Sequence, residues 1–150
     1  MPKIDLRTAP QRKGSSYPSP FDQPCAERLR TRLGEAGGLT QFGVNLLELQ
    51  PGSWSSQRHW HSEEDELVYV VAGEVTLVTD AGEQLLHAGE CAAFPKGVAD
   101  GHHLINRSSQ VVVLLEVGSR SETDVCRYSD IDMMIDGKVG HYVRRDGTRY

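Results

Sequence analysis

Between residues 40 and 118 the chain alternates short apolar runs with glycine, proline and polar turns. Period-two alternation and β-branched residues are typical of strands. Apolar residues at helical spacing do not extend over a useful length in this region. The clearest strand candidates are F-G-V-N-L-L-E-L at 42–49, L-V-Y-V-V at 67–71, E-V-T-L-V-T at 74–79 and V-V-V-L-L-E-V at 111–117. Many short strands at regular spacing predict an all-β sandwich or barrel.

Two flanks differ in composition from this central region and divide the chain into three parts. Residues 1–24 are rich in proline, serine and charge and cannot form much core alone, so we expect an extended arm. Tyr17 and Phe21 are its candidate anchors on the domain or on a partner subunit. Residues 25–118 are the predicted barrel, and residues 119–150 are a polar C-terminal extension packed on the barrel.

The segment R-L-R-T-R-L at 28–33 has two interpretations. Its alternation of basic with apolar residues or threonine favours a strand. The surrounding residues are also good helix formers, which is the rival reading. Glycines at 34, 37 and 38 end whichever element forms.

Composition limits the class of protein and its partners. A chain of 150 residues with 38% hydrophobic and 25% charged residues is typical of one soluble globular domain. The net charge is −5 and no basic patch has interleaved aromatics, which argues against nucleic acid as a partner. The apolar run at 111–115 is too short to span a bilayer, and the N-terminus lacks a signal-peptide core. We therefore expect no membrane association and a cytoplasmic location.

Three cysteines, Cys25, Cys91 and Cys126, are odd in number and widely spaced. Neither a disulfide framework nor a zinc ribbon is indicated by that pattern. Cys91 belongs to the apolar run C-A-A-F, and we expect it to pack inside as a small hydrophobic residue.

Candidate chemistry concentrates at residues 59–66. His59 and His61 are two residues apart, so in a strand both imidazoles point to one face and can bind one ion. Glu66 opens the next apolar strand and is the nearby carboxylate best placed to point inward. The alternate positions of that strand, Leu67, Tyr69 and Val71, then form a second apolar face. We expect that face to be covered by the arm or by another subunit, which predicts a homodimer.

Two longer motifs contain these residues, and together they resemble those of the cupin superfamily. The first is filled by Gly52, His59, His61, Glu66 and Gly73, with one extra residue before His59. The second is filled by Gly89, Pro95, Gly97, His102 and Asn106, with two extra residues before His102. The insertion leaves His102 and His103 as alternatives for the last histidine, and the His-x3-Asn spacing favours His102.

The resemblance implies a fold and a cofactor. Cupins are double-stranded β-helix or jelly-roll barrels, often homodimeric, with a divalent metal ion held by three histidines and one glutamate. Carried onto this sequence, the ligands are His59, His61, Glu66 and His102. Such ligands suit Zn, Fe, Ni or Mn and do not choose among them. The runs W-H-S-E-E-D-E-L-V-Y-V and G-H-H-L-I-N further resemble small bacterial cupins grouped with sugar-phosphate isomerases.

The family does not fix a reaction, so three functions follow from the sequence. The first is an enzyme acting on a small oxygen-rich metabolite, a sugar or an organic acid, bound at the metal. The alternatives are a non-catalytic protein that binds a small ligand and a metal-dependent dioxygenase. Arg58, Lys96 and Arg107 flank the ligands but are expected to be solvated, so the residues support a phosphate-bearing substrate only weakly.

Overall fold

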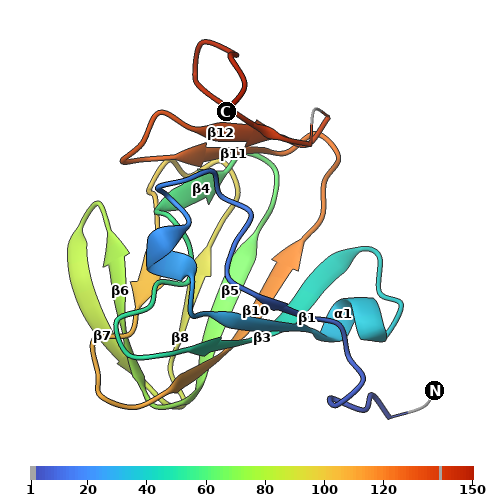
Figure 1. Ribbon diagram of the computed structural model, residues 1–150, viewed down its shortest axis with the longest axis vertical. Coiled ribbons are helices and arrows are strands. Elements are labelled where there is room, and N and C mark those ends of the chain that lie inside the picture. Colours follow the sequence, from blue (N-terminus) through green and yellow to red (C-terminus); the bar gives the residue numbers. More distant parts are fainter. Residues whose placement is uncertain (1–2, 139) are drawn as a thin grey trace.

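Three antiparallel sheets form the computed structural model, which describes residues 3–138 and 140–150 (Figure 1). The strands are β1 (Gln11–Lys13), β2 (Leu29–Arg32), β3 (Phe42–Leu49), β4 (His59–His61), β5 (Glu66–Ala72), β6 (Glu74–Thr79), β7 (Gly82–His87), β8 (Cys91–Phe94), β9 (His103–Ile105), β10 (Val112–Ser119), β11 (Val125–Tyr128), β12 (Met134–Asp136) and β13 (Tyr142–Val143). Helix is confined to α1 (Leu33–Ala36) and the 3-10 turn η1 (Gln23–Cys25) among the described residues. The all-β expectation is confirmed. No described helix is long or apolar enough to cross a bilayer.

The largest sheet has the order β1-β2-β3-β10-β5-β8, and a three-stranded sheet has the order β7-β6-β9. The inward side chains of both sheets form one core. Leu47, Val70 and Leu114 lie side by side on β3, β5 and β10 and are fully buried. Val75 and Leu77 of β6 close the core from the other sheet. The burial of these apolar side chains against one another is the main favourable term for the fold.

The second face of β5 is exposed. Leu67, Tyr69 and Val71 retain 38%, 40% and 47% of their accessible surface. The expectation that the arm covers this face is wrong, because the arm runs elsewhere. Cys91 lies directly opposite Tyr69 on β8, so its side chain points to the same outer face and is exposed. The expectation that Cys91 packs inside is therefore also wrong, since Ala92 takes the inward position.

The N-terminal segment is more integrated than its composition predicts. Residues 11–13 form β1, which pairs with β2 and makes the outermost strand of the large sheet. Tyr17 and Phe21 pack against a second apolar cluster, centred on Tyr128 and Met133. The strand interpretation of residues 28–33 holds as far as Arg32, after which α1 begins.

The C-terminal extension is folded into a sheet of its own. The strands of this sheet have the order β13-β12-β11-β4, so β11 is the one that pairs with β4. The sheet lies across one end of the barrel (Figure 1). This sheet has a small apolar core of its own despite the polar composition of the segment. Its buried residues are Cys126, Tyr128 and Met133. The strand that carries His59 and His61 therefore pairs with the extension, at 126–128, and not with a strand of the large sheet.

Candidate metal centre

Four predicted ligands come from three neighbouring segments at this end of the barrel. His59 and His61 lie on one face of β4, and Glu66 is the first residue of β5. His102 immediately precedes β9 and forms two backbone hydrogen bonds with His59, at 2.8 and 3.1 Å. Gly97 supports the loop before His102, with a φ of +75° that suits glycine and a backbone hydrogen bond of 2.8 Å to the His61 carbonyl.

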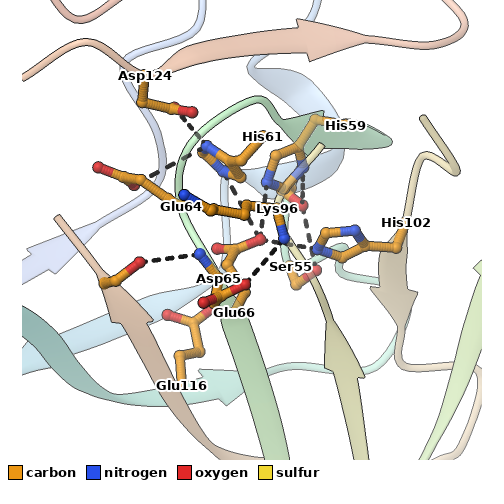
Figure 2. Close-up of polar contacts among 12 residues, drawn as sticks. Ser55, His59, His61, Glu64, Asp65, Glu66, Lys96, His102, Glu116 and Asp124 are labelled. Atoms are coloured by element: carbon orange, nitrogen blue, oxygen red, sulfur yellow. Dashed lines mark hydrogen bonds and ion pairs between the residues drawn. The ribbon is translucent and has the colours of Figure 1, made fainter. Parts of the chain in front are cut away.

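The structure brings all four side chains together around one carboxylate oxygen (Figure 2). The Nε2 atoms of His59, His61 and His102 lie 3.5, 3.6 and 2.8 Å from Oε2 of Glu66. Donor atoms that share one ion at about 2.1 Å stand roughly 3 Å apart in octahedral geometry. The observed separations are close to that value. His59, Glu66 and His102 offer ligand atoms within 4.8 Å of one another, and Nε2 of His61 lies 3.6 Å from the same Oε2, so these residues are a candidate ligand set for a divalent ion.

Outer hydrogen bonds fix the orientation of the two imidazoles on β4. Nδ1 of His59 donates to the Gln57 carbonyl at 2.9 Å. Nδ1 of His61 donates to Oδ2 of Asp124 at 2.6 Å, and Asp124 is almost fully buried. A donor proton on Nδ1 leaves the lone pair on Nε2, which is the tautomer that binds metal. Asp124 is thus a positioning residue for His61.

His102 and His103 point to opposite faces. The His102 ring stacks on Phe94, with centroids 3.5 Å apart, and its Nε2 donates to Glu66. Nδ1 of His103 donates to the Ser56 carbonyl at 3.1 Å, and its ring packs edge-on against Trp54. The structure therefore places His102, the residue favoured by the His-x3-Asn spacing, beside Glu66.

Electrostatics at this cluster favour an ionised glutamate. Burial alone would raise the pKa of Glu66, but the hydrogen bond from His102 and the nearby imidazoles of His59 and His61 outweigh it and hold that pKa well below its ordinary value. Burial, together with repulsion from the other imidazoles, lowers the pKa of His102. The hydrogen bond to the anionic Glu66 puts the proton of a neutral His102 on Nε2, so binding a cation through Nε2 requires that proton to leave or to move to Nδ1.

Several residues at the cluster were not anticipated from the sequence. Asp124, Cys126 and Tyr128 reach it from β11 and the preceding turn. They lie more than sixty positions after His59, and no local spacing signals their approach. Glu64 lies beside His61, with Oε2 at 3.9 Å from Nδ1, and neither motif marks it as a site residue. Burial raises the pKa of Glu64, and it also raises that of the Cys126 thiol, which disfavours a thiolate ligand.

A cavity of about 370 Å³ opens beside the cluster and reaches the inner face of the large sheet. Its wall includes the four predicted ligands, Glu64, Glu116, Tyr128 and several arginines. This volume is within the range of sites that bind small metabolites. Arg58, by contrast, lies outside the cavity and is paired with Asp80 and Asp130. Lys96 and Arg107 are exposed and paired with Glu63 and Glu83, as expected for rim residues.

Comparison with known proteins agrees with this geometry. Residues 45–118 match the model of the cupin domain family. A solved sugar phosphate isomerase of the cupin superfamily from Silicibacter pomeroyi is 45% identical, with 99% of this chain and 96% of that chain covered and a TM-score of 0.93. A candidate sugar phosphate isomerase from Acidithiobacillus ferrooxidans is 29% identical over 83% of this chain and 81% of that chain, with a TM-score of 0.74.

More distant structures share the fold alone. A polyketide cyclase from Streptomyces resistomycificus is 22% identical over 79% of each chain, with a TM-score of 0.61. Among proteins of curated function, the comparison finds no match. The double-stranded β-helix expected from the motifs is confirmed by the sheets and by these relatives. On its likeness to the S. pomeroyi protein over nearly the whole length of both, the chain belongs to the cupin superfamily.

Proposed function

We propose that this protein is a metal-dependent isomerase of a small sugar derivative. The observation that carries the proposal is the convergence of three imidazole Nε2 atoms on Oε2 of Glu66, in the wall of a metabolite-sized cavity. The proposed ligands are His59, His61, Glu66 and His102. The likeness to proteins described as sugar phosphate isomerases supports the choice of reaction. When bound, a divalent ion polarises carbonyl and hydroxyl oxygens, which acidifies the adjacent C–H group.

The chain supplies a candidate for the proton transfer that isomerisation requires. Glu64 lines the cavity, and its Oε1 accepts a hydrogen bond from the Ser121 backbone N–H at 2.7 Å. Its Oε2 has no hydrogen bond to a described residue and is available to a substrate. We assign Glu64 the removal of the proton beside the carbonyl and its return to the neighbouring carbon. Atoms and electrons balance within the substrate, so no oxidant is needed.

The test combines metal analysis with proton exchange. The purified chain is analysed for bound metal, then incubated in D2O with aldose and ketose phosphates and followed by NMR. The proposal expects metal near one ion per chain and deuterium incorporation beside the carbonyl that stops after chelation. The Glu64→Gln variant should keep the metal and lose exchange by about a hundredfold or more, the usual worth of a positioned acid–base group.

The same samples separate the alternatives. Substrate binding without exchange would contradict the isomerase and favour a non-catalytic binding protein. Oxygen consumption with organic acids or sugars would favour a dioxygenase. A chain that binds no divalent metal under any loading condition would contradict the metal site itself.

A further inference from the structure

Three arginines gather on the inner face of β1 and β2. Arg12 lies directly opposite Arg30 in the β1–β2 ladder, so both side chains point to the same face. Arg28 is two residues from Arg30 and lies on that face as well. All three line the cavity that also contains the predicted metal ligands. Like charges opposite each other on a sheet are destabilising, so the cluster needs a compensating negative charge.

Only one of the three arginines has an ion pair among the described residues. Glu116 pairs with Arg30, with Nε and Oε2 3.0 Å apart. Arg28 is almost fully buried, yet its guanidinium donates to the Gly14 and Ser55 carbonyls and forms no ion pair among the described residues. Arg12 likewise has no ion pair within residues 3–138 and 140–150. Guanidinium groups stay protonated, so Arg12 and Arg28 are two cations without a carboxylate partner among the described residues, whereas Arg30 is paired with Glu116.

Arg28 is the most informative member of the cluster. Burial, reinforced by the charge of Arg30, lowers the pKa of Arg28. A buried cation without a counter-ion is costly, and a fold tolerates it where a ligand supplies the missing charge. The other carboxylates of the cavity, Glu64 and Glu66, form no ion pair with Arg12 or Arg28; their hydrogen bonds come from the Ser121 backbone and from His102.

The arginines lie far enough from the predicted metal-binding residues for one bound molecule to contact both, with a different group at each end. Strands β3 and β10 separate β2 from β5, so the path along the sheet is three strand steps, roughly 14 Å at about 4.8 Å each. The barrel curves, which shortens the direct path across the cavity. A ligand held by the metal through its sugar oxygens can therefore extend a terminal group toward the arginines.

We propose that Arg12, Arg28 and Arg30 form a subsite for the phosphate group of a phosphorylated sugar. The identity of the sugar part of the substrate rests on the proposed function. Binding of the phosphate depends only on the three arginines. A phosphate monoester carries nearly two negative charges at neutral pH, so it can pair with both Arg12 and Arg28. Arginine also binds phosphate oxygens in a bidentate manner, which orients the substrate.

The test uses inorganic phosphate as the probe on the full chain stripped of metal by a chelator. Melting temperature and titration calorimetry are measured at constant ionic strength, with acetate as the carboxylate comparison. Melting temperature should rise with the logarithm of phosphate concentration and respond much less to acetate. Arg12→Gln should weaken phosphate binding roughly ten- to hundredfold, the worth of one charge-assisted hydrogen bond. Arg12 is exposed, so this variant is expected to fold.

The matched control is Arg107→Gln, which removes the same charge from an exposed arginine paired with Glu83. Its phosphate affinity should be unchanged. Arg28→Lys keeps the charge of the buried position and should lose less affinity than Arg28→Gln. No phosphate binding by the stripped wild type, an equal loss in Arg107→Gln, or equal binding of acetate would each overturn the subsite.

A further variant separates this inference from the proposed function. His59→Ala should lose metal and isomerase activity while its affinity for phosphate stays unchanged. If phosphate affinity disappears with the metal, the ion and not the arginines holds the anion. That result would overturn the subsite and leave the metal-dependent isomerase standing.

Discussion

At the scale of single residues, the two ring nitrogens of each imidazole in the candidate centre have different surroundings. In His59 and His61, Nδ1 is engaged by Gln57 and Asp124, and Nε2 faces Glu66. His102 lacks such an outer hydrogen bond, since its Nδ1 is buried with no partner among the described residues. Stacking on Phe94 holds its ring. Outer hydrogen bonds thus orient the imidazoles of His59 and His61, whereas ring stacking orients that of His102.

The adjacent histidines give a direct test of the ligand set. His102→Ala should reduce bound metal to a small fraction of wild type, because it removes one of the four proposed ligands. His103→Ala should keep the metal and lower the melting temperature, since it deletes a buried ring packed on Trp54. Metal content by mass spectrometry and thermal melts check both. Loss of metal in His103→Ala, with retention in His102→Ala, would reverse the assignment.

Asp124 tests the outer hydrogen bond of His61. Asp124→Asn should weaken metal binding by roughly 10- to 100-fold, because the neutral amide holds the imidazole less firmly and makes it a poorer donor. Competition with a chromogenic chelator measures the affinity. Asp136→Asn is the control, since it makes the same change at a half-buried residue of β12 that belongs to none of the candidate metal-binding groups. Equal affinity in Asp124→Asn and wild type would contradict a positioning role.

At the scale of elements, β10 is the strand on which the barrel depends. It pairs with β3 on one side and with β5 on the other, which joins the strand of Glu66 to the N-terminal strands. Its inward residue Leu114 lies between Leu47 and Val70, and all three are fully buried. The geometry of the cavity therefore rests on the packing of this row.

Leu114→Ala tests that packing. The substitution should lower the free energy of unfolding by about 2–5 kcal/mol, because it leaves a cavity in a fully buried row. Leu85→Ala on β7 should change it by less than about 1 kcal/mol, since Leu85 is 52% exposed. Urea denaturation measures both. Similar losses in the two variants would show that burial in the core does not decide stability here.

At the scale of the whole molecule, the large sheet has an apolar outer side. Leu67 and Tyr69 of β5 lie beside Val117 and Leu115 of β10 on that side. Both β5 residues are about two-fifths exposed, and the arm packs on the C-terminal sheet instead. An apolar face of this kind is typical of an interface between subunits. The homodimer stays a prediction from this face.

Light scattering at micromolar concentration should give twice the 16.6 kDa mass of one chain. Leu67→Glu should shift the mass toward that of the monomer, because it places a charge in the apolar face. Leu85→Glu, on an exposed position of β7, should leave the mass unchanged. A wild-type mass of one chain would contradict the dimer.

The sequence alone determined what depends on short spacings. Alternation along 67–71 predicted Val68 and Val70 as inward residues, and both are buried. The two-residue spacing of His59 and His61 put both imidazoles on one face, because strand side chains repeat every second residue. The motifs also indicated Glu66 and His102 as their neighbours. Each of these follows from local geometry or from a pattern that the family shares.

The tertiary structure decided everything that depends on contacts between distant segments. Asp124 and the strand that pairs with His59 and His61 come from the extension that composition alone marks as polar. Arg12 and Arg30 face the cavity because the four ladders from β1 to β5 set their register against β5. Local patterns do not encode such pairings, since they arise from burying a shared core. The four residues proposed as metal ligands could therefore be named from the sequence, whereas the groups that position them and the basic wall opposite them could not.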